Sequence, residues 1–180
     1  MYGHSPVVLT REYGSSSSTG NLILDAMMEK HLMPLPDFKI AVGLRADFPK
    51  GDITLGDVIS TFPFNNDLIE MDLTGRDLKS LMTHATNLTN GVLQVSKSVA
   101  VVYDSKKPLN QRLISFTING KPVEDNQTYR IATHSFCASG GDGFEAFLNG
   151  KNVKTIPGTT SAESNQSITS KSINLSPRLN

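Results

Sequence analysis

Residues 136–144 carry the side chains best suited to bind a ligand. They read FCASGGDGF and place one acid, Asp142, among three glycines. Glycine tolerates positive φ angles and lets a ligand approach the backbone closely. Asp142 would then be a fixed hydrogen-bond acceptor, with the aromatic face of Phe136 a few residues upstream. A strand-to-helix turn capped by Asp142 explains the same residues equally well.

A second aromatic segment, residues 62–66, lies far back in the chain and reads FPFNN. Two aromatic faces and a carboxylate suit a planar ring that carries hydroxyls, such as a nucleoside. The sequence contains no Gly-x-Ser-x-Gly elbow and no P-loop, so it offers neither an activated serine nor a phosphate cradle. It also contains no His-x-x-x-His or Cys-x-x-Cys spacing. We therefore expect a binding site, with no catalytic residue and no metal ligand in this chain.

The composition predicts one soluble globular domain. The chain has 180 residues, 38% of them hydrophobic, and a formal net charge of +0. This charge balance does not draw it to nucleic acid. No apolar run is long enough to span a bilayer, and residues 1–6 lack the pattern of a signal peptide. The single cysteine, Cys137, excludes an intrachain disulfide and is expected to be a small buried side chain rather than a nucleophile.

Helix and strand patterns alternate along the chain without regular βαβ units. Two Thr-x-x-Asp sequences, starting at Thr54 and Thr74, resemble capping boxes and should open helices. Alternation in residues 68–73 indicates a half-buried strand, and Asn119-Gly120 indicates a tight hairpin. Residues 14–19 read as a flexible loop. Further helices are expected at residues 20–28 and 143–148, and further strands at 38–42, 92–95, 99–103, 113–118 and 129–133, the last clear strand.

This order of elements predicts the fold class. Hairpins mixed with isolated helices favour an α+β domain with mixed or antiparallel sheets and flanking helices. We expect a single domain over residues 1–157. Residues 158–180 are rich in Ser, Thr and Asn and are interpreted as a polar C-terminal tail.

Several separated motifs occur together in the order typical of one family. They are TGNLILDAM (19–27), ITLGDV (53–58), FPFNN (62–66), LTGRDL (73–78), LQVS (93–96), VYD (102–104), NGKP (119–122) and SGGDGF (139–144). The ordered set, which spans about residues 11–150, resembles the C-terminal, substrate-binding domain of 5′-nucleotidases and UDP-sugar hydrolases. Each motif is short, and it is their order that is specific.

The resemblance implies that the chain is one part of a two-domain phosphoric ester hydrolase. In that family an N-terminal metallophosphoesterase domain holds two divalent metal ions and the nucleophilic water. The C-terminal domain binds the nucleoside or nucleotide. We therefore expect no cofactor on this chain, divalent metals in an N-terminal domain that it lacks, and no hydrolysis by this chain alone. The family also implies an extracytoplasmic location: periplasmic, secreted or at the cell surface.

The resemblance also implies roles for six side chains. Two phenyl rings would sandwich the base, a carboxylate would accept hydrogen bonds from ribose hydroxyls, and arginines would face the phosphate. An asparagine would contact the sugar or base. The resemblance assigns the base to Phe64 and Phe136 and the ribose to Asp142. It assigns the phosphate to Arg45, with Arg11 as a second arginine on that side, and the amide contact to Asn66.

One departure from the family pattern leaves a second hypothesis open. Ile40 stands where the family has a base-contacting asparagine, and its side chain can offer no hydrogen bond. The chain could therefore be a stand-alone nucleotide-binding or surface module without hydrolase activity. Asp-x-His and Asn-His-Glu motifs upstream would favour the enzyme over the module. A third hypothesis is a purely structural domain in which residues 140–143 form only a turn.

Overall fold

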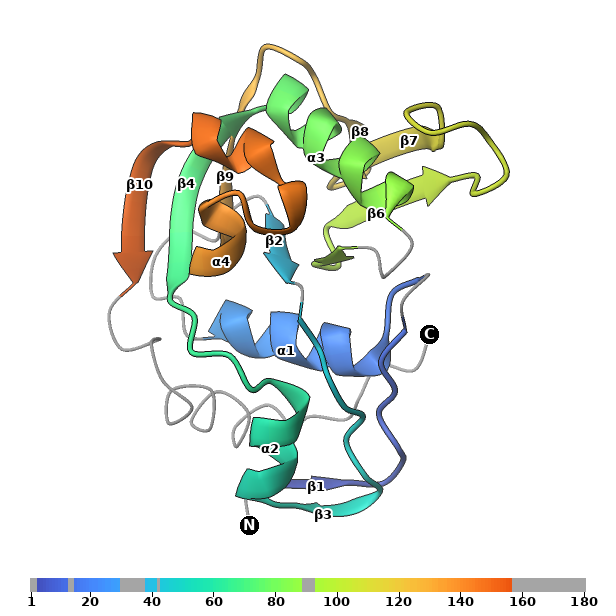
Figure 1. Ribbon diagram of the computed structural model, residues 1–180, viewed down its shortest axis with the longest axis vertical. Coiled ribbons are helices and arrows are strands. Elements are labelled where there is room, and N and C mark those ends of the chain that lie inside the picture. The colour runs from blue at the N-terminus through green and yellow to red at the C-terminus, as the bar shows by residue number, and fades with distance from the viewer. Residues whose placement is uncertain (1–2, 13–14, 30–37, 42, 89–92, 157–180) are drawn as a thin grey trace.

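A computed structural model describes residues 3–12, 15–29, 38–41, 43–88 and 93–156 (Figure 1). Its largest sheet has five strands in the order β10-β4-β9-β2-β5, in which β2 and β9 run parallel and the other pairs are antiparallel. A three-stranded sheet, β6-β7-β8, and a two-stranded sheet, β1-β3, complete the fold. The predicted α+β class with mixed and antiparallel sheets is confirmed. The predicted tail, residues 158–180, lies outside the described residues.

The expected elements occur in their predicted order, together with several short elements that the sequence did not predict. The helices are α1 (Ser18–Glu29), α2 (Leu55–Thr61), α3 (Gly75–Asn87) and α4 (Ser135–Ala138), with 3-10 turns η1 (Gly141–Gly143) and η2 (Glu145–Asn149). The strands are β1 (Gly3–Ser5), β2 (Phe38–Ala41), β3 (Gly51–Ile53), β4 (Leu68–Thr74), β5 (Gln94–Val95), β6 (Val99–Tyr103), β7 (Leu113–Ile118), β8 (Lys121–Pro122), β9 (Thr128–His134) and β10 (Lys151–Ile156).

Strand β4 is buried on both faces, so the prediction of a half-buried strand is wrong. Its odd-numbered side chains pack with α3 in the main core, as the helix pattern predicts. On the opposite face, Leu68 packs with Leu24 of α1. Glu70, only 8% exposed, pairs with Arg130 of β9 at 3.2 Å. The alternation of polar and apolar residues therefore reflects a buried ion pair and not a face open to solvent.

Strand β10 was not expected from the sequence. It pairs antiparallel with β4 at the edge of the five-stranded sheet, where Figure 1 shows it on the outside of the molecule. Its residues are exposed apart from Ile156, which is half-buried. A strand with so little buried surface lacks the hydrophobic alternation by which strands are predicted. Backbone pairing with β4 forms this strand, and lysines at its exposed edge are typical of protected edges.

Helix α1 begins earlier than predicted, at Ser18. The Ser17 hydroxyl accepts a hydrogen bond from the Gly20 amide at 3.0 Å, as an N-cap does. Ser17 and Thr19 are both buried, and the Thr19 hydroxyl donates to the Leu9 carbonyl at 2.7 Å. The described part of the expected loop is therefore an ordered helix start, because serine and threonine favour caps as well as loops.

Both predicted capping boxes are present. The Thr54 hydroxyl accepts from the Asp57 amide, and the Asp57 carboxylate accepts from the Thr54 amide at 2.7 Å. The same reciprocal pair joins Thr74 and Asp77 at the start of α3. The predicted hairpin is also confirmed, since Asn119 and Gly120 have φ angles of 52° and 75° between β7 and β8. Each of these local signals needs only neighbouring residues, which explains why the sequence predicts them well.

We expect Asp57→Ala to lower the free energy of unfolding by about 0.5–1 kcal/mol at neutral pH, because it removes half of the capping box. Hydrogen bonds from the Thr54 side chain and backbone hold the pKa of Asp57 below its ordinary value of 3.8. The stabilisation is therefore present above pH 3.8 and is lost as the pH falls through the lower folded-state pKa. Urea unfolding across this range measures it. Ser60→Ala, at an exposed position of the same helix, is the control, and a wild-type advantage that persists at low pH would contradict the prediction.

Candidate ligand-binding site

Phe136 is held at the surface by the end of β9 and the glycine loop. It lies in α4, directly after the strand, and 43% of the residue is exposed. Its ring rests on Gly141, where an added Cβ would come within 2.6 Å of the ring atoms. Glycine is therefore required at residue 141 for the ring to lie against the loop. This contact places Phe136 against the loop that carries Asp142.

The segment 62–66 is tied to the start of α4 through Ser135. The Ser135 amide donates to the Asp67 carbonyl at 2.8 Å, and the Asp67 amide donates to the Ser135 hydroxyl at 3.1 Å. The same hydroxyl donates to the Asn66 side-chain oxygen at 3.4 Å. These bonds bring the two aromatic segments together across the sequence. Serine has no pattern that would predict such a role, so Ser135 was missed.

Four rings form a row between the two segments. Phe64 meets Phe62 edge-on with centroids 6.4 Å apart, and Phe62 meets His134 at 6.3 Å. His134 in turn is stacked with Phe136 at 6.5 Å. Phe64, 38% exposed, and Phe136 stand at the two ends of this row. The structure thus brings the two aromatic segments together, with each phenylalanine partly exposed and its ring partly covered, that of Phe64 by Arg45 and that of Phe136 by His134 and Gly141.

Arg45 and Arg11 lie together beside Phe64. The Arg45 guanidinium sits 4.9 Å from the centre of the Phe64 ring, a cation–π distance, and its amide donates to the Thr61 carbonyl at 2.9 Å. The Arg11 guanidinium donates to the Arg45 carbonyl, and the Arg11 amide donates to the Asp47 carboxylate at 2.8 Å. Both predicted arginines therefore belong to the Phe64 end of the row.

Asp142 occupies a left-handed backbone conformation, with φ 54° and ψ 24°. Gly140 and Gly143 on either side also have positive φ angles, 84° and 80°. The Asp142 carbonyl accepts a hydrogen bond from His84 Nε2 at 2.8 Å. Its side chain is exposed, and no described residue donates a hydrogen bond to the carboxylate. The interpretation of Asp142 as a turn cap therefore finds no support in the described residues.

Cys137 follows Phe136 but faces the core. It is fully buried in the main cluster, and burial raises the pKa of its thiol to about 12. The expectation of a small buried side chain is confirmed. A thiol with so high a pKa carries almost no thiolate at neutral pH and is a poor nucleophile.

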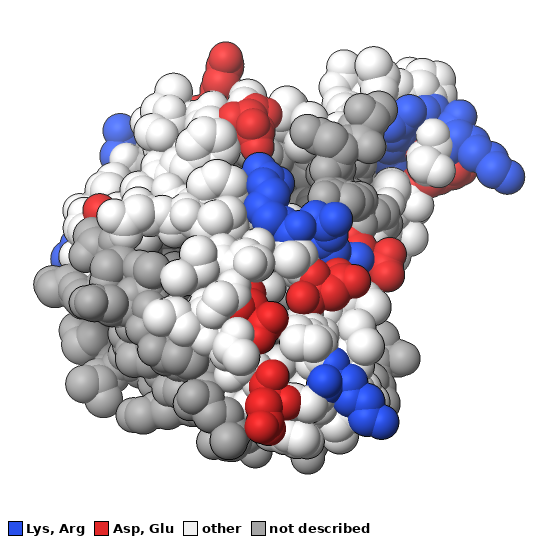
Figure 2. All heavy atoms as spheres, turned by 60° about the horizontal axis from the view of Figure 1, so that its bottom comes forward, with Lys and Arg blue, Asp and Glu red and all other residues white. Residues whose placement is uncertain are grey.

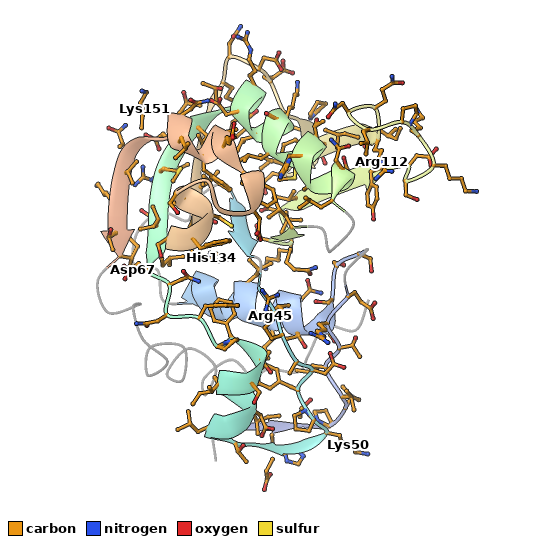
Figure 3. All side chains as sticks on the ribbon, in the orientation of Figure 1. Arg45, Lys50, Asp67, Arg112, His134 and Lys151 are labelled. Carbon is orange, nitrogen blue, oxygen red and sulfur yellow. The ribbon has the colours of Figure 1, made fainter. Side chains whose placement is uncertain are left out.

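The candidate site lies in the central part of the molecule. Figure 3 marks Arg45 and His134 there, whereas Lys50 and Lys151 lie toward the periphery. On the face drawn in Figure 2, basic and acidic side chains are interspersed, so no broad field of one sign covers that face. An anionic ligand at the site would be met by individual side chains such as Arg45.

The described residues contain neither a cluster of metal ligands nor a helix that could span a membrane. Nowhere in them do three His, Cys, Asp or Glu side chains gather as metal ligands would. Within the same ranges, no helix is both long and apolar enough to cross a lipid bilayer.

The segments that carry these side chains belong to an α+β domain with mixed and antiparallel sheets. The sequence model of the 5′-nucleotidase C-terminal domain matches residues 2–149. The chain belongs to this family, as the motif order predicts.

Relatives with curated descriptions agree with this assignment. The trifunctional nucleotide phosphoesterase protein YfkN of Bacillus subtilis is 35% identical over 162 residues, covering 81% of this chain and 11% of the relative. An apyrase of Tabanus yao is 34% identical, covering 86% of this chain and 32% of the relative. Protein UshA of Escherichia coli is 31% identical, covering 74% and 24%. The chain thus spans a third or less of the length of these relatives.

Solved structures share the fold. The 5′-nucleotidase precursor of Thermus thermophilus superimposes with a TM-score of 0.83 at 24% identity, covering 99% of this chain and 38% of that chain. The NAD nucleotidase of Haemophilus influenzae superimposes with a TM-score of 0.73 at 19% identity, covering 95% and 35%. The architecture is therefore the one that C-terminal parts of larger nucleotidases have.

Proposed function

We propose that this domain binds the nucleoside part of a nucleotide and thereby sets the substrate specificity of a phosphohydrolase. The observation that carries the proposal is the meeting of residues 62–66 with residues 134–142 at one surface. That meeting gathers two exposed phenyl rings, an unshielded carboxylate and a pair of arginines. The names of the relatives, nucleotide phosphoesterase, apyrase and 5′-nucleotidase, support a nucleotide as the ligand class.

The rings are suited to hold a base. Phe64 and Phe136 remain well exposed although each is fixed by its neighbours, Phe64 by Arg45 and Phe136 by Gly141. Stacking a base on one aromatic side chain contributes roughly 1–3 kcal/mol and tolerates different bases. Rings held in place lose little conformational freedom when the base enters. We therefore assign Phe64 and Phe136 to the two faces of the base.

The polar groups are suited to the remaining parts of a nucleotide. Asp142 lies in the loop against Phe136, so its carboxylate can accept hydrogen bonds from two neighbouring ribose hydroxyls. Arg45 and Arg11 lie at the Phe64 end, where they can face a phosphate. Asn66, tied to Ser135 between the two segments, can contact the sugar or the base.

Hydrolysis is assigned to a separate metallophosphoesterase domain, which would hold the divalent metals. The thiol of Cys137 is buried, so it is not placed to act as a nucleophile. The domain would present the nucleotide so that its phosphate reaches the metal-bound water of that second domain. We propose that this reaction takes place outside the cytoplasm, as the family resemblance implies.

Isothermal titration of adenosine and AMP into the chain tests the proposal. We expect both to bind, and AMP to bind more tightly because its phosphate reaches Arg45 and Arg11. Arg45→Ala should remove much of the difference between the two ligands, and it should weaken adenosine binding by a smaller factor because Arg45 also lies against the Phe64 ring. Arg112→Ala, far from the site and directly before β7, is the matched control. A folded sample that gives no heat at millimolar ligand would reject the proposal.

A further inference from the structure

We infer that His84 is a positioning residue that sets the direction of the Asp142 carboxylate. The inference rests on the proposed nucleoside-binding function. His84 lies in the last turn of α3, a helix that holds none of the predicted site residues. Its Nε2 lies 2.8 Å from the Asp142 carbonyl oxygen. A carbonyl can only accept, so Nε2 must carry the hydrogen and donate it.

The imidazole is itself held rigidly. It packs edge-on against Phe144, with centroids 4.7 Å apart and planes at 88°. Phe144 is only 1% exposed, so it is an immobile part of the core. A Cβ added to Gly143 would come within 3.0 Å of His84 Cε1, and Gly143 also has a φ of 80°. His84 thus braces three consecutive residues, 142–144, against the helix.

Asp142 needs such a brace because of its conformation. A left-handed aspartate is less stable than an extended or helical one by roughly 1 kcal/mol. Among the described residues, His84 donates a hydrogen bond to the Asp142 carbonyl. No described residue donates one to the Asp142 carboxylate. The direction of the carboxylate therefore depends on the backbone angles of Asp142, which His84 holds.

Little else supports this side of the loop. A hollow of about 470 Å³ borders His84, Gly143 and Phe144, and it is lined on the far side by polar residues such as Asn87 and Asn110. Phe144 packs in the core with α3, but beside it the loop borders open space, and the His84 hydrogen bond lies at the edge of this hollow. Without that bond, the peptide group between residues 142 and 143 would rotate more freely. The Asp142 carboxylate would then adopt several orientations instead of one.

The test compares two ligands that differ only at the sugar. Adenosine has the ribose hydroxyls that Asp142 would accept, and dideoxyadenosine lacks both. His84→Phe keeps a ring against Phe144 but loses the donor. We expect it to weaken adenosine binding roughly three- to tenfold and to leave dideoxyadenosine binding unchanged. His84→Gln, whose amide can donate to the same carbonyl, should retain most of the adenosine affinity.

A double-mutant comparison separates positioning from folding. In an Asp142→Ala background, His84→Phe should have no further effect on adenosine, because there is no carboxylate left to direct. Equal losses for both ligands, or additive losses in the double variant, would overturn the inference. If Asp142→Ala itself leaves adenosine binding unchanged, the ribose role in the proposed function fails instead. If only His84→Phe is without effect, the proposed function stands and the inference fails.

Discussion

Replacing Phe136 with alanine weakens adenosine binding about 5- to 150-fold, the equivalent of roughly 1–3 kcal/mol of lost stacking. The expected loss is large because Phe136 serves two purposes. Its ring is one of the two exposed faces of the row, and it also covers Gly141 in the loop that carries Asp142. Its removal would take away a stacking surface and loosen the loop on that side. Isothermal titration measures the affinity.

The fold should tolerate this substitution. Phe136 is 43% exposed and does not belong to the main core cluster, so we expect urea unfolding to shift little. Ile114→Ala is a matched control, since Ile114 is similarly exposed but lies on β7, in a different sheet. It should leave both affinity and stability near wild type. A Phe136→Ala variant that loses stability but keeps its adenosine affinity would favour the purely structural interpretation of this segment.

The sequence predicted those elements that depend on neighbouring residues. The Thr54–Asp57 and Thr74–Asp77 boxes and the Asn119-Gly120 turn are visible in four residues or fewer, and all three are present. Strand β10 was missed because its residues bury little surface and rely on pairing with β4. The alternation in β4 suggests a face open to solvent, but Glu70 on that face is buried and pairs with Arg130 of β9. That strand is adjacent in the sheet but about 60 residues away in the sequence, so the pairing cannot be predicted from neighbouring residues.

The candidate site shows the same division between local and distant information. The family resemblance led to both phenylalanines, both arginines, Asn66 and Asp142, and the fold brings the segments that carry them to one surface. Ser135 and His84 could not be found in this way. Each acts through a hydrogen bond to a residue 58 or more positions away, and neither has a spacing pattern that marks it. Supporting residues of this kind become visible only when the tertiary contacts are known.

Gly75→Ala should be among the most destabilising single substitutions in this domain. Gly75 is the first residue of α3 and is buried, and its amide donates to the Gln127 carbonyl at 2.9 Å. A Cβ at this position would lie 2.1 Å from the backbone oxygen of Glu124. The obstacle is backbone rather than a flexible side chain, so the turn before β9 or the helix start must shift. We expect a loss of about 3 kcal/mol or more in the free energy of unfolding, measured with urea.

Gly56 provides the matched control, because it lies in the equivalent first turn of α2 within the other Thr-x-x-Asp box. A Cβ there would have an ordinary contact, 3.5 Å from the Thr54 hydroxyl. Gly56→Ala should therefore be neutral or stabilising by up to about 1 kcal/mol, since alanine favours a helix over glycine. The contrast isolates the cause, as both variants add the same methyl group to the same kind of helix start. If the two variants change the free energy of unfolding by the same amount, the close approach of α3 to the Glu124 backbone is not the reason that residue 75 must be glycine.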